Sequence, residues 1–395
     1  MTTEISPAPV ADSRIKCAIC GALIHSVQQH LGREHTELAM TIKMYQEKFP
    51  DSPLLSEIAK LKIEDHMRAK AEAEKSAAVN IDSVPVNAKQ LFHELFSLGS
   101  SAATMGASGR PISISVMAEN PEHVNMVPDI DPNYIFNVEI LKSLMMGIEM
   151  RIPVYLWGHA GTGKTSIFEQ IAARTRRPFF RVQHTANMEE EHIVGGWRLR
   201  DGKTFFELGP LAMAMKYGWM YMADEYDFGR PEVTSVYQAV LERKPLVIKE
   251  ADHENRVIRP HPNFCIIGTG NTNGQGDESG LYSGTNIQNA ANYERFGVVE
   301  QMPYMDKALE SRLVSQQANI PLKDAEKLVD FAGRVRAEFD GGRLGNPISP
   351  RSLIYAGQIG VARSNYRIGL EKAFINRLTA TDRESATQVA QRVFA

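Results

Sequence analysis

The 395-residue sequence predicts an α/β protein with a parallel sheet, a helical region after the sheet and a small zinc-binding segment before it. Three observations carry this prediction. Apolar runs of strand length at residues 154–157, 219–223 and 264–268 are each followed by glycine or polar residues, as is usual for buried parallel strands. A glycine-rich turn joins the first run to a helix. Two cysteines and two histidines near the N-terminus have the spacing of metal ligands.

The first segment, residues 1–63, is expected to bind Zn²⁺. Two residues separate its cysteines and four separate its histidines, so the four side chains can converge on a tetrahedral ion. The gap between the two pairs is short, and His25 is an alternative ligand; the alternative without metal is a reduced cysteine pair with surface histidines. The predicted ligands are Cys17, Cys20, His30 and His35.

This segment also resembles the zinc finger of the Ros-type bacterial regulators. Those regulators share the compact Cys2His2 spacing and a following helix with an aromatic pair, here Tyr45 and Phe49. Their finger contacts DNA, so the resemblance implies DNA as a partner. Two alternatives without DNA are equally consistent with the sequence. The zinc ion could only stabilise the fold, because so small a domain needs the metal to fold, or the segment could bind another protein.

Residues 64–126 are expected to form a charged helix and a flexible linker. Ala, Glu and Lys dominate residues 64–78, with Lys70 and Glu74 four residues apart, while Gly, Ser and Ala cluster at residues 98–111. The α/β core is expected over residues 127–303, with an apolar helix at 138–150 and a hairpin turn at Asp201-Gly202, and a helical lid over residues 304–395.

The glycine-rich turn has the spacing G-x-x-x-x-G-K-[ST] of a Walker A loop. Its glycines turn the backbone tightly enough for successive N–H groups to surround a phosphate at the N-terminus of the next helix. The lysine would reach the β- and γ-phosphates of ATP, and the last hydroxyl would bind Mg²⁺. The loop consists of Gly158, His159, Ala160, Gly161, Thr162, Gly163, Lys164 and Thr165.

The second apolar run ends in Asp224 and Glu225, as a Walker B strand does. Asp224 would hold Mg²⁺, and Glu225 would orient and polarise the water that attacks the γ-phosphate. The third run leads to Asn271. Because the carboxyl ends of parallel strands line one crevice, this amide is expected to act as a sensor facing the γ-phosphate.

Two arginines are further candidates for catalysis. Arg295 precedes the next predicted strand, and we expect it to act as an arginine finger on the ATP of a neighbouring subunit; the alternative is an arginine that caps a helix end. Arg351 begins a helix in the C-terminal region, where a positive charge is unfavourable unless it serves an anion, so it is expected to reach the phosphates from the lid.

With these motifs in view, the chain from residue 127 onward resembles the AAA+ ATPases of the MoxR group, and most closely the ATPase subunit of aerobic cobaltochelatase. The resemblance rests on Val-Pro-Asp-Ile-Asp-Pro-Asn-Tyr at 127–134, the loop at 158–165, Asp-Glu-Tyr-Asp at 224–227, Gly-Arg-Pro-Glu at 229–232, Val-Ile-Arg-Pro-His-Pro at 257–262, Gly-Thr-Gly-Asn at 268–271, Gly-Asp at 276–277, Gly-Leu-Tyr at 280–282, Gly-Thr at 284–285 and the segment around Arg295.

The resemblance implies an AAA+ P-loop NTPase with a helical lid, assembly into a ring that is usually hexameric, and a partner with a von Willebrand A domain. The leading hypothesis is an ATP-hydrolysing motor that remodels this partner. One alternative is the chelatase subunit itself, which drives Co²⁺ insertion into a corrin. The N-terminal zinc segment and positions such as Asn273 and Gln275 depart from that subunit. A second alternative is a DNA-associated ATPase recruited through its zinc finger.

Composition excludes other classes. A net charge of −3 and a pI near 6.4 argue against an overall surface for nucleic acid. No stretch of about 18 uncharged apolar residues is present, and the first 13 residues lack the pattern of a secretory signal, so a cytoplasmic protein without a membrane segment is expected. The third cysteine, Cys265, lies in an apolar run and is expected to be plain core.

Overall fold

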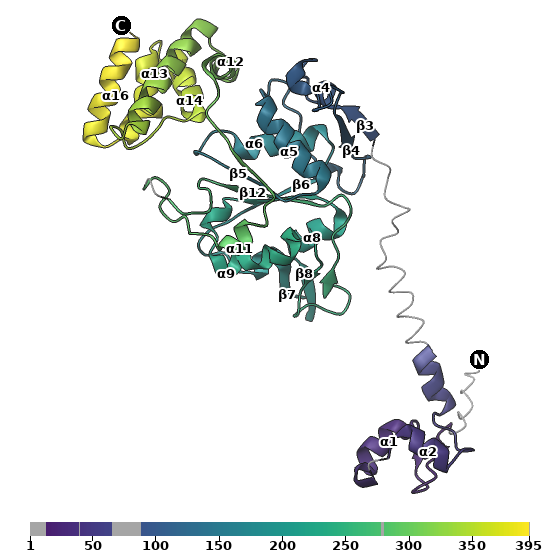
Figure 1. The fold of residues 1–395 in the computed structure, drawn as a ribbon. Coiled ribbons are helices and arrows are strands. Elements are labelled where there is room, and N and C mark those ends of the chain that lie inside the picture. The colour runs from purple at the N-terminus through teal and green to yellow at the C-terminus, as the bar shows by residue number, and fades with distance from the viewer. Residues whose placement is uncertain (1–12, 39, 65–87, 278–279, 395) are drawn as a thin grey trace, which may run out of the picture. The chain divides into compact units, whose positions relative to one another are not determined.

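The computed structural model describes residues 13–38, 40–64, 88–277 and 280–394 (Figure 1). The chain divides into two units, Met1–Val84 and Pro85–Ala395. Of the charged helix predicted over residues 64–78, only residue 64 is described, and the rest lies outside the described residues. Within the described ranges, no helix combines the length and the apolar character needed to span a bilayer.

The N-terminal unit has a very small core. Its elements are β1 (Ile15–Lys16), β2 (Leu23–Ile24), α1 (Val27–Glu34), the 3-10 turn η1 (Thr36–Leu38) and α2 (Ile42–Lys48). The two strands pair antiparallel. Among the residues of this unit that the structure describes, four apolar side chains form the buried cluster, which is too few to hold a domain of this size without a crosslink. They are Cys17, Val27, Leu31 and Tyr45.

The large unit is built on a five-stranded parallel sheet with the strand order β13-β5-β12-β9-β6. The three runs that the sequence predicted as strands are β5, β12 and β9, which are neighbours at the centre of this sheet. Central strands are covered on both faces and therefore read as continuous apolar runs. The predicted α/β fold is confirmed. The strands are β5 (Val154–Trp157), β6 (Phe179–Gln183), β9 (Met220–Asp224), β12 (Cys265–Gly270) and β13 (Val298–Gln301).

Helices cover both faces of the sheet (Figure 1). On one face, α5 (Val138–Met150) and α6 (Lys164–Arg174) bury Leu141, Leu144 and Phe168 against the strands. On the other face, α8 (Pro210–Tyr217) and the short helices after β9 form a second apolar layer. The helix predicted at residues 138–150 is confirmed.

The predicted flexible linker is wrong for residues 88–116. This segment contains β3 (Ala88–Leu91), α4 (Phe92–Leu95), the 3-10 turn η3 (Ala102–Thr104) and β4 (Ser113–Val116), and β3 pairs antiparallel with β4. The glycines and serines that suggested a linker form the connection between two short strands. Phe92, Phe96 and Ile114 are buried against α5, so their burial fixes the hairpin on the core.

The C-terminal region is helical, as the sequence predicted. Its helices enclose an apolar core of their own. A buried ion pair, with 2.7 Å between Arg336 NH2 and Glu310 Oε1, joins the second of these helices to the first. The helices are α12 (Lys307–Ala318), α13 (Leu322–Asp340), α14 (Pro350–Ala362), α15 (Tyr366–Ala373) and α16 (Ala380–Val393).

The remaining elements of the large unit are short and connect those already described. The predicted turn at Asp201-Gly202 is confirmed, since β7 and β8 pair antiparallel on either side of it. The short elements are η4 (Val124–Met126), α7 (Glu191–Val194), β7 (Gly195–Arg200), β8 (Lys203–Leu208), η5 (Tyr226–Phe228), α9 (Pro231–Thr234), η6 (Ser235–Tyr237), α10 (Gln238–Leu241), β10 (Leu246–Val247), β11 (Val257–Ile258), α11 (Ala290–Tyr293) and η7 (Ile375–Arg377).

Candidate functional site

The predicted Walker A loop connects the end of β5 to the start of α6. Gly163 precedes the helix with a φ of 96°, and Gly161 has a φ of 78°, which side chains other than glycine rarely adopt. A Cβ added at Gly161 would lie 2.9 Å from the Cβ of Ser349 in the C-terminal region. The loop therefore folds tightly over the N-terminus of α6, where free N–H groups favour an anion.

Lys164 is folded back across this loop. Its Nζ donates to the carbonyl oxygens of Gly158 at 2.7 Å and His159 at 3.1 Å, and to Oδ1 of Asn271 at 3.1 Å. Burial lowers the pKa of Lys164 to about 8, although the carboxylates of Asp227, Asp224 and Glu225 act in the opposite direction. The structure thus brings the predicted phosphate-binding lysine into contact with the predicted sensor.

Asp224 ends β9 and is almost completely buried. Its Oδ1 accepts a hydrogen bond from the Thr165 hydroxyl at 3.4 Å and another from the Thr269 hydroxyl. Its Oδ2 lies 2.6 Å from Nε of Arg181 on β6. A hydroxyl oxygen and a carboxylate oxygen side by side at a helix start are the hard ligands that Mg²⁺ prefers, so the residues present fit this ion.

Glu225 adopts a left-handed backbone with a φ of 51°, directly after the strand. Such strained conformations in residues other than glycine cluster at functional sites. Gln183, at the end of β6, donates from Nε2 to Oε2 of Glu225 at 2.6 Å. The carboxylate that is predicted to polarise water is therefore held by an amide from the neighbouring strand.

Asp227 connects the Walker B segment to the sensor. Its Oδ2 accepts hydrogen bonds from the backbone N–H of Asn271 at 2.8 Å, and from the N–H and hydroxyl of Thr272, both at 2.9 Å. Its Oδ1 is buried and has no hydrogen-bond partner among the residues that the structure describes. Burial raises the pKa of Asp227, against the effect of these hydrogen bonds. This side chain fixes where the third strand ends and hence where Asn271 points.

The C-terminal region approaches the loop closely. A Cβ at Gly161 would lie 3.6 Å from the Cβ of Arg351, and the Arg351 charge contributes to the lowered pKa of Lys164. The His159 ring stacks on Tyr304 with 5.5 Å between centroids. A cavity of about 280 Å³ separates the loop from this region. Its lining includes His159, Ala160, Tyr282, Tyr304, Pro347 and Arg377.

Arg295 is engaged within its own chain. Its Nε donates to Oε1 of Glu242 at 2.7 Å, and its NH1 group donates to the carbonyl oxygen of Ala291 in α11. The second contact is the helix-end cap that the sequence left as an alternative. The hydrogen bonds of Arg295 therefore go to Glu242 and α11, and not to the predicted phosphate-binding residues.

In the N-terminal unit, the four predicted zinc ligands are brought together. One ligand atom from each lies within 4.8 Å of the other three. Cys20 Sγ and His30 Nε2 are 3.1 Å apart, and the buried His35 Nε2 has no hydrogen-bond partner within the described part of the chain. The alternative ligand His25 instead bonds the Ser56 hydroxyl through Nδ1 at 2.9 Å. This donor set fits tetrahedral zinc.

Sequence reasoning missed the contribution of β6. Gln183 and Arg181 contact the two Walker B carboxylates because β6 pairs in parallel with β9, with Gln183 opposite Asp224. Only residues 180–183 alternate between apolar and polar side chains, and a run of four residues is too short to identify a strand from the sequence alone. The role of Asp227 has no local signal either.

Comparisons with known proteins agree with this geometry. Residues 153–285 match the family model of the AAA domain (dynein-related subfamily), and residues 310–394 match that of the CbbQ/NirQ/NorQ C-terminal domain. Aerobic cobaltochelatase subunit CobS of Sinorhizobium sp is 33% identical over 278 residues, which cover 68% of this chain and 83% of that protein. Protein CbbQ of Hydrogenophilus thermoluteolus is 28% identical over 247 residues, which cover 62% and 88%.

Among solved structures, the RuvB Holliday junction branch migration motor of Thermotoga maritima overlaps 67% of this chain and 72% of its own, with 13% identity and a TM-score of 0.40. CobS and CbbQ have a higher sequence identity to this chain than RuvB has. With both the AAA domain and the CbbQ-type C-terminal domain present in one chain, and with most of CobS covered, the chain belongs to the MoxR-type AAA+ ATPases, which bind ATP with Mg²⁺ and hydrolyse it.

Proposed function

We propose that the chain is the ATPase subunit of a ring-shaped motor that remodels a partner protein. The observation that carries this proposal is the convergence of Lys164, Asp224, Glu225 and Asn271 at the carboxyl edge of the parallel sheet, beside a helical region that contacts the phosphate-binding loop. Purified wild-type protein that released no inorganic phosphate from ATP under any partner condition would refute it.

In this proposal, each side chain has one task. The loop and Lys164 hold the β- and γ-phosphates, and bound Mg²⁺, held by Thr165 and Asp224, supplies charge neutralisation. Glu225 accepts the proton of the attacking water, and Asn271 orients that water against the γ-phosphate. Arg351 contributes positive charge from the lid. The 280 Å³ cavity between loop and lid is the space for the nucleoside.

The partner is proposed to be a protein with a von Willebrand A domain, which the MoxR-type family implies. The Glu225→Gln chain, which should keep ATP bound, is the appropriate bait in a pull-down from the native host. Recovery of a von Willebrand A protein by this bait, but not by Lys164→Ala, would support the assignment.

A second candidate is the ATPase subunit of a cobaltochelatase, favoured by the 33% identity to CobS over most of that protein's length. In that role, the motor drives Co²⁺ insertion into a corrin by another subunit. The two candidates differ in the proteins that co-purify. A corrin-binding subunit captured by the Glu225→Gln bait would support the chelatase, and its absence, with a different partner present, would favour a general remodelling motor.

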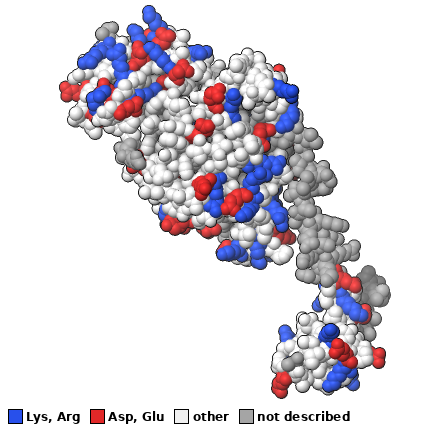
Figure 2. Space-filling model, in the orientation of Figure 1, with Lys and Arg blue, Asp and Glu red and all other residues white. Residues whose placement is uncertain are grey.

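Recruitment to DNA through the zinc segment remains a third candidate, and the charges of that segment count against it. Residues 13–64 carry seven Lys and Arg and six Asp and Glu, and Figure 2 shows basic and acidic side chains intermixed on this unit. DNA binding needs a basic surface that displaces counterions from phosphates. Salt-dependent binding by residues 1–63 would support DNA recruitment, and no binding at low salt would remove it.

The zinc ion is proposed to hold the N-terminal unit together. Cys20→Ala or His30→Ala should lose one zinc per chain in metal analysis and should make residues 13–64 sensitive to protease, because the four-residue core is too small alone. His25→Ala is the matched control and should keep the metal, since His25 bonds Ser56 instead. Loss of zinc from His25→Ala, or a protected unit without metal, would contradict the assignment.

The depressed pKa of Lys164 predicts a pH dependence of nucleotide affinity. Only the charged ammonium attracts phosphate, and a bound triphosphate keeps the proton on Lys164, so binding is strongest below the free-state pKa of about 8. The Kd for Mg·ATP should therefore be flat up to about pH 7 and should rise by up to about tenfold per pH unit above about pH 8. Equilibrium titrations with a fluorescent nucleotide measure this. Lys164→Arg stays charged and should give a flat profile; a flat wild-type profile would contradict the prediction.

Asp227 is proposed to position the sensor. Asp227→Ala should lower kcat by about 10²-fold with little change in KM, because Asn271 loses the carboxylate that fixes its backbone. Asp227→Asn should retain most activity, since the amide oxygen can replace Oδ2 while the amide nitrogen occupies the place of the unpartnered Oδ1. Equal losses in the two variants, measured by steady-state phosphate release, would argue against positioning through these hydrogen bonds.

A further inference from the structure

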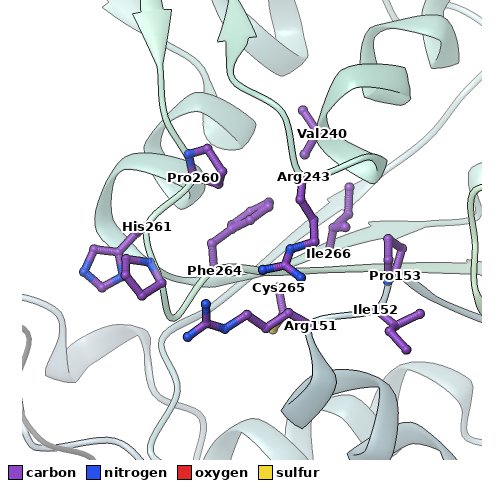
Figure 3. Close-up of a pocket in the computed structure, with 11 residues that line it drawn as sticks. Arg151, Ile152, Pro153, Val240, Arg243, Pro260, His261, Phe264, Cys265 and Ile266 are labelled. Atoms are coloured by element: carbon purple, nitrogen blue, oxygen red, sulfur yellow. The ribbon is translucent and has the colours of Figure 1, made fainter. Parts of the chain in front are cut away.

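A second cavity lies at the edge of the sheet opposite the nucleotide site. Pro153 and Phe264, which line it, directly precede β5 and β12, whereas the phosphate-binding loop and Asn271 follow those strands. A four-residue strand is roughly 13 Å long, so the two sites are separate. The cavity measures about 140 Å³ (Figure 3). Its lining consists of Arg151, Ile152, Pro153, Val240, Arg243, Pro260, His261, Pro262, Phe264, Cys265 and Ile266.

Two arginines dominate the polar part of this lining. Figure 3 shows the side chains of Arg151 and Arg243 extending from different elements toward the same space. Neither guanidinium forms an ion pair or a side-chain hydrogen bond with any residue that the structure describes. No Asp or Glu is present in the lining. The cavity therefore holds two positive charges without an internal counterion.

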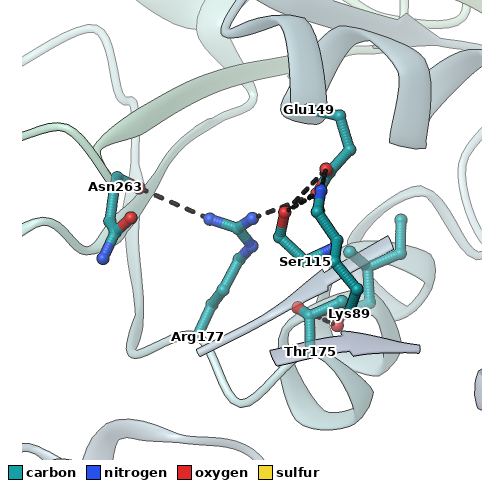
Figure 4. A network of polar contacts seen from close by, with 7 residues as sticks. Lys89, Ser115, Glu149, Thr175, Arg177 and Asn263 are labelled. Carbon is teal, nitrogen blue, oxygen red and sulfur yellow. Dashed lines mark hydrogen bonds and ion pairs between the residues drawn. The ribbon is translucent and has the colours of Figure 1, made fainter. Parts of the chain in front are cut away.

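Two acidic side chains adjoin the lining residues in sequence or in charge interaction, and both are engaged with other partners. Glu149 accepts hydrogen bonds from the N–H and hydroxyl of Ser115 and from Lys89, and lies 3.6 Å from NH2 of Arg177 (Figure 4). These contacts outweigh the effect of burial and lower the pKa of Glu149, so it is ionised. Glu242, next to Arg243 in sequence, pairs with Lys244 and Arg295. Neither acid neutralises the cavity.

His261 adds a neutral donor. Its Nδ1 accepts the backbone N–H of Asn263 at 3.0 Å, so the ring proton of the neutral form is on Nε2. Burial first, and the Arg151 charge second, lower the pKa of His261, which keeps the ring neutral near pH 7. The lining of the cavity thus combines two arginines with one neutral imidazole.

Both arginines follow helix ends and have left-handed backbones, with φ values of 57° and 60°. A cation near a helix C-terminus is favourable, and this accounts for a basic residue at either position alone. It does not account for two such side chains beside one cavity. Both side chains are exposed, so water already screens much of their repulsion, and an anion between them would reduce it further. Guanidinium groups match the planar or tetrahedral oxygens of carboxylate and phosphate through paired hydrogen bonds.

We propose that this cavity is a binding site for one small oxyanion, a phosphate or carboxylate group held between Arg151 and Arg243 with His261 as a third donor. The volume corresponds to roughly five water molecules, which suits one such group and is below the roughly 300 Å³ of sites for whole nucleotides or drug-sized ligands. The site takes either a free phosphate or the carboxylate of an acidic side chain on a neighbouring protein.

The test uses the full-length chain saturated with Mg²⁺ and a non-hydrolysable ATP analogue, so that the γ-phosphate position of the nucleotide site is also filled. Calorimetric titration with inorganic phosphate, at ionic strength held constant with sodium chloride, should give one saturable site per chain. Arg151→Gln and Arg243→Gln should each weaken this binding by about tenfold, as expected for the loss of one charge-assisted pair. Arg363→Gln, an exposed arginine at the end of α14, is the matched control and should bind as wild type does.

A parallel titration with acetate distinguishes the two sources. Tighter binding of phosphate assigns a phosphate ligand, and acetate bound as well or better assigns an acidic side chain. If Arg151→Gln fails to fold, Arg243→Lys provides a second test. Lysine keeps the positive charge but loses the paired N–H groups of the guanidinium, so this variant should bind phosphate more weakly than wild type. No saturable binding of either anion, or equal binding by the double Gln variant, would overturn the proposal. The affinity for the ATP analogue, measured on the same samples, separates this outcome from any failure of the nucleotide site.

Discussion

Glu225→Gln is expected to keep ATP bound and to lower its hydrolysis by about 10²- to 10⁴-fold, the usual contribution of a general base. The amide has nearly the shape of the carboxylate but cannot accept the proton of the attacking water. Gln183 donates to Glu225 through an amide nitrogen, and the carbonyl oxygen of a new glutamine at 225 can accept the same hydrogen bond. The fold and the phosphate-binding loop should therefore be unchanged.

Two measurements check this expectation. Phosphate release gives the rate, and equilibrium binding of Mg·ATP gives the affinity, which should stay within about threefold of wild type because Glu225 is bonded to Gln183 and Thr269 rather than to the loop. Glu254→Gln, an exposed carboxylate on the connection between β10 and β11, is the matched control and should hydrolyse ATP normally. Normal turnover by Glu225→Gln would remove Glu225 from the catalytic assignment.

The fold and the centre of the site could be predicted because both depend on local sequence signals. Continuous apolar runs identified β5, β9 and β12, and the carboxyl ends of these strands meet by the geometry of a parallel sheet. The contact between Lys164 and Asn271, 107 residues apart, follows from this geometry alone. The four predicted zinc ligands converge, as their spacing in the sequence suggested.

The features that sequence reasoning missed depend on tertiary neighbours. Gln183 reaches Glu225 only because β6 pairs with β9, and residues 179–183 are too short and too mixed in polarity to be recognised as a strand by themselves. The Gly, Ser and Ala residues at 98–111 predict a linker, while burial of Phe92 and Phe96 against α5 decides the structure of the whole segment 88–116. The composition of a segment indicates its local conformational preference, and tertiary packing of its apolar side chains can override that preference.

Arg295 is expected to act on the ATP of an adjacent subunit, and Arg295→Ala should lower hydrolysis by about 10³- to 10⁵-fold while each chain still binds ATP. Within its own chain, this side chain is held by Glu242 and by the end of α11, so it must exchange the Glu242 carboxylate for the γ-phosphate of a neighbour. Arg363→Ala, on an exposed helix end, is the control and should leave the rate unchanged.

Mixing two inactive variants separates action in trans from action in cis. A Lys164→Ala chain cannot hold ATP but keeps Arg295, and an Arg295→Ala chain holds ATP but lacks the arginine. If the arginine acts across the interface of a closed ring, random mixing in equal amounts creates competent sites at about a quarter of the interfaces, and phosphate release should reappear. If Arg295 serves only its own chain, or only caps α11, no mixture can regain activity, because every chain in it lacks one essential side chain.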